Sequence, residues 1–237
     1  MSKAQVTLFV MIGLVMMVVA ALFFYAVDVT QKREVQVAEV SSAKQLVEYC
    51  LDAVAEDALI AIGRNGGFAA PANDRFAPLN ATYLADAGEN KVPEPAQVSE
   101  ELSDYIEHNF NKCVDGFSAL ESKGIDVDIT GDPEVNTIIA ERDVQFIITY
   151  AIAEIKAGKV TIPEFTPVRK AVRLKEMLQL ANDIVASELK TGLFDLDVQC
   201  AFDVTHFPLD KTLITVIADK NVLIQNAPYS LVFAHKR

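Results

Sequence analysis

An uncharged apolar stretch, Val6–Val27, constrains the organisation of this chain more than any other feature. It reads VTLFVMIGLVMMVVAALFFYAV. At ~1.5 Å of helical rise per residue it would span about 33 Å, enough to cross the hydrocarbon core of a bilayer. We therefore predict a short leader at residues 1–5, a transmembrane helix at residues 6–29 and a single domain at residues 30–237.

The apolar stretch differs from a cleaved secretory signal peptide. Such a signal has an apolar core of about 7–15 residues and a small-x-small cleavage site. Here the run is longer and ends in Leu22–Asp28, LFFYAVD, which is a poor site. The Lys and Arg count around the span slightly disfavours an exported domain. The glycosylation sequon at Asn80, Asn-Ala-Thr, supports export, and we predict retention of the span with an extracytoplasmic domain.

The residues before the apolar stretch resemble a class of archaeal leader. Lys3–Phe9, KAQVTLF, followed by an uninterrupted apolar helix, is similar to the class III signal sequences of type IV pilin-like proteins. The resemblance implies cleavage just before the helix, between Ala4 and Gln5. In the bacterial pattern the fifth mature position is Glu, whereas this chain would carry Phe9 there.

A second resemblance covers more of the chain. Glu48–Leu51, EYCL, and Ile62–Phe68, IGRNGGF, look like parts of an uncharacterised family of archaeal single-pass proteins. That family has a similar anchor, a Cys in the first helix after the membrane and a Gly-Gly-aromatic turn. The resemblance implies architecture and location, and it implies no activity.

The charge of the chain disfavours nucleic acid as a partner. Asp and Glu number 33 against 21 Lys and Arg, for a net charge of -12. An acidic domain repels both phosphate backbones and anionic lipid surfaces. Its charge is typical of a soluble surface whose like charges keep molecules apart. Hydrophobic residues make up 51% of the chain, which is ample for a folded core.

Hydrophobic periodicity predicts an α+β fold, with helices packed on a mainly antiparallel sheet after the transmembrane helix. Spacings of three and four predict helices, alternation predicts strands, and Gly-Pro-Asn-Asp clusters predict loops. The predicted elements are a helix over 41–64 ended by Gly66-Gly67, a loop over 68–95, a helix capped by Ser99 and ending near Cys113, an antiparallel meander of four strands over 125–165, a helix over 169–190 and two or three strands over 212–234.

The cysteines and histidines show no metal-site spacing. Cys50, Cys113 and Cys200 lie far apart without a CxxC pair, and His108 and the other two histidines, His206 and His235, are isolated in sequence. If the helices carrying Cys50 and Cys113 pack antiparallel, the two sulfurs would meet in a disulfide. In a cytosolic domain all three cysteines would instead be buried thiols.

No enzyme motif is present in the sequence. The GxSxG, HExxH and phosphate-loop patterns are absent, so we predict no catalytic residue, no cofactor and no metal. The i,i+2 pairs Asp126/Asp128 and Asp195/Asp197 are typical of the solvated face of an edge strand, although paired carboxylates also suit acid–base chemistry or a cation.

These patterns favour a membrane-anchored structural or interaction protein, pilin-like or part of cell-envelope assembly. Its expected partners are membrane lipid through the N-terminal helix, copies of itself and other envelope proteins. The alternative is a membrane-tethered hydrolase or ligand-binding domain, which would need a deep pocket with converging polar groups. A tethered module facing the cytoplasm is a third reading.

Overall fold

The computed structural model describes residues 41–70, 74–77, 79–191, 201–209 and 211–236. Contacts divide the chain into Met1–Ser41 and Ser42–Arg237, and the fold below is that of the second unit. The predicted leader and the predicted span at residues 6–29 lie outside the described residues. Among the helices that are described, none is both long and apolar enough to cross a membrane.

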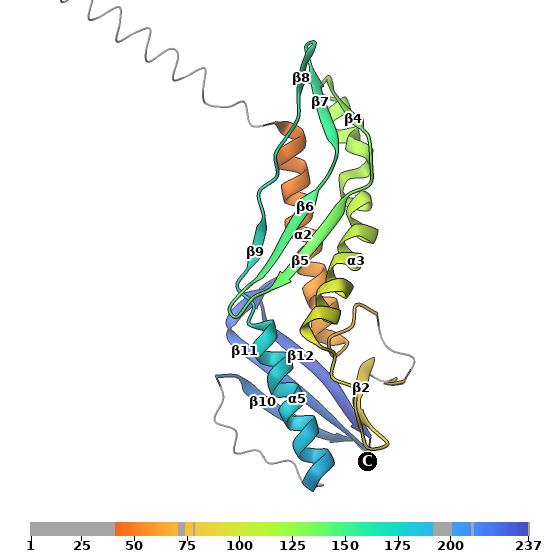
Figure 1. Cartoon of the computed structure of the whole chain (residues 1–237), viewed down its shortest axis with the longest axis vertical. Coiled ribbons are helices and arrows are strands. Elements are labelled where there is room, and N and C mark those ends of the chain that lie inside the picture. Colours follow the sequence, from red (N-terminus) through yellow and green to blue (C-terminus); the bar gives the residue numbers. More distant parts are fainter. Residues whose placement is uncertain (1–40, 71–73, 78, 192–200, 210, 237) are drawn as a thin grey trace, which may run out of the picture. The chain divides into compact units, whose positions relative to one another are not determined.

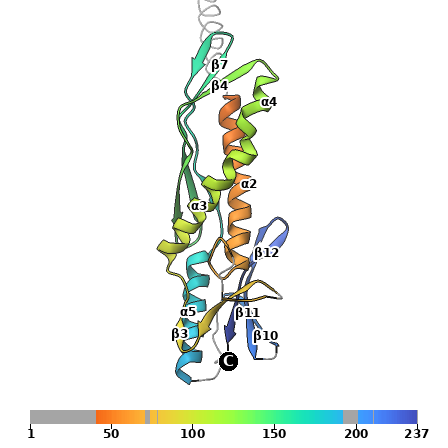
Figure 2. The ribbon, with the colours of Figure 1, turned by 90° about the vertical axis from the view of Figure 1, so that its right-hand side faces the viewer.

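The predicted α+β class is confirmed: three helices pack on mixed and antiparallel sheets (Figures 1 and 2). The helical elements are α2 Ser42–Arg64, α3 Pro95–Val114, η1 Asp115–Phe117, α4 Ser118–Glu121 and α5 Leu174–Thr191. The strands are β1 Arg75–Phe76, β2 Ala81–Asp86, β3 Glu89–Asn90, β4 Ile125–Ile129, β5 Glu134–Ile139, β6 Val144–Thr149, β7 Ile152–Lys156, β8 Lys159–Thr161, β9 Val168–Lys170, β10 Asp203–Leu209, β11 Thr212–Ile224 and β12 Ala227–Lys236.

Helix α2 forms where the periodicity predicts it and is covered by its neighbours on most of its apolar positions. Its N-terminus is held by Glu154 of β7, whose carboxylate accepts a hydrogen bond from the Ala43 amide at 2.8 Å. Near its C-terminus Gly63 allows a close approach to the Ser230 carbonyl of β12, because a Cβ there would clash with that oxygen. Gly66 and Gly67 then take positive φ angles of 70° and 100° and end the helix, as predicted.

Helix α3 begins five residues earlier than predicted, because Glu94 rather than Ser99 is the residue before its first turn. Pro95 occupies its first turn, where its missing amide hydrogen costs nothing, and Glu94 is the extended residue before it. Ser99 is therefore not the cap: its hydroxyl donates to the Thr137 carbonyl of β5. The apolar side of the helix, including Leu102 and Phe110, is buried as expected.

The predicted four-strand meander is wrong. Strands β4 and β5 do not pair with each other; β4 pairs with β7 and β5 with β6, while β8 and β9 add a third strand to each sheet. Strands β4 and β5 form one arm of a long hairpin, and β6 and β7 form the other. The Gly131-Asp132-Pro133 segment only bends the first arm, and the chain reverses direction at residues 140–143. The predicted third strand is broken at Tyr150 and Ala151, where the partner changes from β5 to β4.

The remaining sheet has the strand order β1-β2-β12-β11-β10, with β3 paired to β2. Every pair in it is antiparallel except β2 with β12, which is parallel. Strand β2 falls in the segment predicted as a loop with short extended pieces, and β10 falls in a segment without a predicted strand. Strand β11 shifts register between Asp219 and Leu223, which explains why its sequence resembles two shorter strands.

Helix α5 begins at Leu174 rather than at residue 169. Residues 168–170 are drawn into β9 by pairing with β6, and Arg173 is held by Asp219 of β11 at 2.8 Å. The predicted stripe of α5 is largely buried, with Met177, Leu178 and Val185 in the core. Leu189 is the exception: it is exposed, and Glu188 instead faces the sheet.

Candidate functional site

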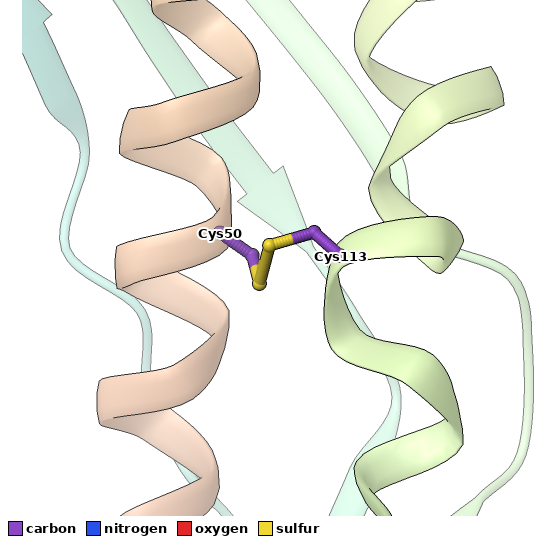
Figure 3. Close-up of a disulfide and its surroundings, with 2 residues drawn as sticks. All are labelled: Cys50 and Cys113. Carbon is purple, nitrogen blue, oxygen red and sulfur yellow. A yellow bond between two sulfur atoms is a disulfide. The ribbon is translucent and has the colours of Figure 1, made fainter.

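Cys50 and Cys113 join α2 to α3 through a disulfide (Figure 3). Their Cα atoms lie 5.7 Å apart and the two residues are 63 positions apart in sequence. Cys50 is fully buried, so the bond crosses the interface between the two helices rather than the surface. In the chain-entropy account, closing a loop of this length contributes about 4 kcal/mol to stability.

Lys170 fixes β9 against α2 on the same part of the domain. Its ammonium group lies 2.8 Å from Asp52 and 2.7 Å from Glu56, both on α2. Burial by itself lowers the pKa of Lys170, but hydrogen bonds to these two carboxylates outweigh it, and the pKa is raised. The lysine therefore stays charged and holds two like charges together on one helix.

A chain of four polar side chains runs between α5 and the sheet formed by β10, β11 and β12. Glu188 of α5 pairs with Nδ1 of His235 on β12. Nε2 of His235 lies 2.8 Å from the Thr215 hydroxyl of β11, which lies 2.9 Å from Nδ1 of His206 on β10. His235 and Thr215 are both fully buried. The fold thus brings together two histidines that are isolated in sequence.

The strand register brings these side chains together. His206 lies directly opposite Thr215, and His235 lies diagonally from Thr215 across the β11–β12 pair. A threonine hydroxyl has one proton, so it donates to one imidazole and accepts from the other. When His235 is neutral and carries its proton on Nδ1, the nitrogen that faces the Glu188 carboxylate, its Nε2 accepts from Thr215, and Thr215 accepts from His206. All four groups then have mutually consistent roles.

The order of groups matches that of an acid–histidine–hydroxyl triad, but their burial does not suit a nucleophile. In such a triad the carboxylate orients the imidazole and the imidazole activates the hydroxyl. Thr215 has no exposed surface, and its oxygen is shared between two imidazoles. A substrate carbonyl has no route to this hydroxyl, so the geometry suits a structural network in the core.

The electrostatics of the chain disfavour a charge on His206. Burial lowers its pKa, and the neighbouring His235 lowers it further, while the carboxylate of Glu188 acts in the opposite direction. Thr215 and Glu188 were not predicted as site residues. A signal was present, because Thr215 is a polar position within the apolar alternation Leu213, Ile217 of one strand face.

A shallow hollow of about 330 Å³ lies between the end of α2 and the β11–β12 turn. Its lining combines Ile60 and Arg64 of α2 with Tyr229 and neighbouring residues of the strands. The Tyr229 hydroxyl is buried without a hydrogen-bond partner among the described residues, and burial raises its pKa. The hollow is separate from the Glu188–His235 chain, so the polar groups do not converge on it.

The other predicted residues lie apart from these features. Asn80 is exposed in a turn with a φ of 53°, while the Thr82 hydroxyl of its sequon is buried and donates to the Asn65 carbonyl at 2.7 Å. Asp126 and Asp128 are exposed on β4, and His108 is exposed on α3. Ala4, Gln5, Asp195, Asp197 and Cys200 lie outside the described residues.

Among the residues that the structure describes, no three His, Cys, Asp or Glu side chains are grouped so that they could hold a metal ion. No known protein family, no curated protein and no solved structure matches the chain.

Proposed function

We propose that the chain is a membrane-anchored extracytoplasmic protein whose domain has a structural or interaction role in the cell envelope. The observation that carries this proposal is the Cys50–Cys113 disulfide in a domain that follows an uncharged apolar stretch. Apolar stretches of this length partition into bilayers, and disulfides persist in compartments outside the reducing cytosol. The buried, shared hydroxyl of Thr215 adds support, since it argues for a structural core rather than a catalytic one.

The location is tested by counting reactive thiols in intact cells. The chain has three cysteines, so cells quenched in acid and denatured should give one adduct with a maleimide polymer before reduction and three after it. Protease added to intact cells should also degrade the domain. Three adducts without reduction, or full protection from the protease, would place the domain in the cytoplasm and contradict the proposal.

The pilin-like version adds cleavage between Ala4 and Gln5 and packing of the apolar helix against copies of itself. The leader and its resemblance support cleavage. Most apolar residues of α2 are buried within its own domain, although Tyr49 is exposed, so the main surface for such packing would be the chain before Ser42. Mass spectrometry of the mature N-terminus decides: Gln5 as the first residue supports the pilin-like version, and Met1 or Ser2 supports a plain anchor.

The tethered hydrolase or ligand-binding domain is a second candidate because of the Glu188–His235–Thr215 order and the hollow beside Arg64. A panel of ester and amide substrates tests the hydrolase version with purified protein. Hydrolysis that disappears in Thr215→Val, while His108→Ala retains it, would replace the structural role with an enzymatic one.

A further inference from the structure

Among the described residues, the sheet of β10, β11 and β12 carries helices on one face only. The inner face, which includes Ile217 and Phe233, belongs to the main core together with residues of α2 and α5. The outer face, defined here as the side chains that share a face with Val216 and Val232, belongs to a separate apolar cluster. All members of that cluster come from strands, among them Ile214 and Ala234. Figure 2 shows α5 on one side of the three strands.

Large apolar side chains of the outer face are exposed. Because residues directly opposite in a ladder share a face, the register places Phe207, Leu209 and Leu223 there. These residues are 50%, 41% and 60% exposed. Val216 and Val232 lie opposite each other between them and are half-buried. Single exposed apolar residues are normal on a protein surface, but a group on one sheet face is typical of an interaction surface.

The strand sequences also differ from those of a sheet with one solvated face. Such strands alternate apolar and polar residues, whereas strands covered on both faces have continuous apolar runs. Residues 213–218 of β11 read LITVIA, and residues 231–234 of β12 read LVFA. The helices on the inner face account for only every second residue of these runs. The pattern therefore predicts a second layer on the outer face.

The outer face has no net charge, although the chain has a net charge of -12. At the described positions of β10, β11 and β12 its charged residues are Asp203 and Lys236. Both are paired within the chain, Asp203 with Lys220 and Lys236 with Asp86. A partner selected by its positive charge would be drawn to the acidic surface elsewhere, so the outer face suits an apolar surface without net charge.

The outer face has the size of a small protein–protein interface. Strands β10, β11 and β12 have 7, 13 and 10 residues. At ~3.3 Å of rise per residue and ~4.8 Å between strands, they outline about 480 Å² of sheet. Two such faces in contact would cover about 960 Å², to which the relief of the side chains adds. Specific interfaces begin at about 1,000 Å² in total, so the area suits a reversible contact.

We propose that the outer face binds the outer face of a second copy of this chain. Twisted sheets of the same hand pack face to face at about 10 Å, with their strands within about 30° of each other. A copy of the same sheet therefore matches this face in twist, in size and in lack of charge. A two-fold axis makes the contact closed, so it yields a dimer rather than a fibre. The inference rests on the proposed interaction role and names its partner.

Engineered thiols test the contact in the full-length chain, reconstituted in vesicles of neutral phospholipid. Cys200→Ala leaves no free thiol once the disulfide between α2 and α3 has formed. In this background Phe207→Cys, Val216→Cys and Ser230→Cys each place one thiol on the outer face, and His108→Cys places one on α3 as the control. A bismaleimide that spans about 10 Å should join two chains of the face variant nearest the two-fold axis. Joining of none of the three, or equal joining of the control, would overturn the inference.

A charge on the outer face should break the contact. Val232→Asp, added to the most efficiently joined variant, should lower the yield of joined chains at least about tenfold, because each copy would bury an unpaired carboxylate. The matched control is Ile138→Asp, at a residue that is 43% exposed on β5 in another sheet, and it should keep the yield. Thermal unfolding checks that both variants fold, and Phe207→Asp repeats the test at a more exposed position. Equal yields in both variants would assign self-association to another surface and overturn the inference.

The salt dependence of the yield distinguishes an apolar contact from an ionic one. Two copies with a net charge of -12 repel each other, and salt screens this repulsion. The yield of joined chains should therefore rise as salt is added. A yield that falls with salt would indicate a contact between opposite charges and would overturn the inference.

Flotation separates this inference from the proposed function. Vesicles washed at alkaline pH should retain the full chain through its anchor. If the chain floats with them and no face variant is joined, the anchor stands and the contact between copies is rejected. If the face variants are joined but the chain does not float, the contact stands and the anchor is rejected.

Discussion

Two regions of the domain are held together by different chemistry. In the first, α2, α3 and strands β4–β9 surround a core crossed by the Cys50–Cys113 disulfide, with Lys170 tying β9 to α2. In the second, α5 packs on β10–β12 through the Glu188–His235–Thr215–His206 chain (Figure 2). The first depends on a covalent bond, which protonation does not alter. The second depends on titratable groups, so the two regions should respond differently to reductant and to pH.

Loss of the disulfide should have the largest effect. We expect Cys50→Ala/Cys113→Ala to lower the free energy of unfolding by about 4 kcal/mol, because the unfolded chain is no longer constrained by the loop. Urea unfolding of the full chain in micelles, with and without reductant, measures this. Cys200→Ala is the control and should behave as the parent. A parent whose stability is unaffected by reductant would show that the bond does not set the stability of the first region.

Removing the central imidazole of the second region should lower the free energy of unfolding somewhat less than loss of the disulfide does. We expect His235→Ala to cost about 3 kcal/mol, since it leaves the Glu188 carboxylate without its imidazole and Thr215 with only one of its two imidazole partners in a buried site. His108→Ala removes an exposed imidazole and should change the free energy of unfolding by less than about 0.5 kcal/mol. Thermal unfolding of both variants makes the comparison. Equal stability of the two would mean that the polar chain does not hold α5 to the sheet.

Lys170 offers a smaller test within the first region. Lys170→Met keeps the aliphatic stem but leaves Asp52 and Glu56 without their cation, so we expect a loss of about 1–2 kcal/mol. The control is Lys175→Met, whose pair with Glu141 is exposed and should contribute little. Chemical unfolding at neutral pH distinguishes them. Similar losses in both variants would show that burial of the ammonium group adds nothing.

The smallest expected effect is a pH dependence confined to the second region. The folded pKa of His206 lies below its ordinary value of 6.5, so the unfolded chain binds this proton more readily. Its contribution to stability is therefore complete above pH 6.5 and is lost as the pH falls through the folded pKa. His206→Gln should show a flatter stability profile below pH 6.5, measured by urea unfolding. A profile as steep as that of the parent would assign the acid sensitivity to other groups.

The sequence predicted the helices better than the strand pairing, for physical reasons. Helix periodicity is a local property, and α2 and α5 bury the stripes that their own spacing defines. Strand pairing depends on residues that are far apart in sequence. Gly131-Asp132-Pro133 has the residues of a turn, although it only bends the chain between β4 and β5. Strand β2, ATYLAD, has few β-branched residues and forms because β12 offers it a partner.

The residues of the candidate site were also predictable only where a local pattern places them. Cys50 and Cys113 could be matched because each lies on a helix whose apolar face is readable from spacing. The contacts of His206 and His235 with Thr215 depend on the register of β10, β11 and β12, and no local pattern fixes that register. Glu188 could not be assigned to the core, because the adjacent Leu189 fits the apolar stripe better than a carboxylate does.

The position of β12 inside its sheet has a consequence for biosynthesis. This strand lies between β2 and β11, yet among the described strands it is the last to be synthesised. The sheet therefore cannot close until β12 has been synthesised, and β2 waits for a partner that emerges well over a hundred residues later.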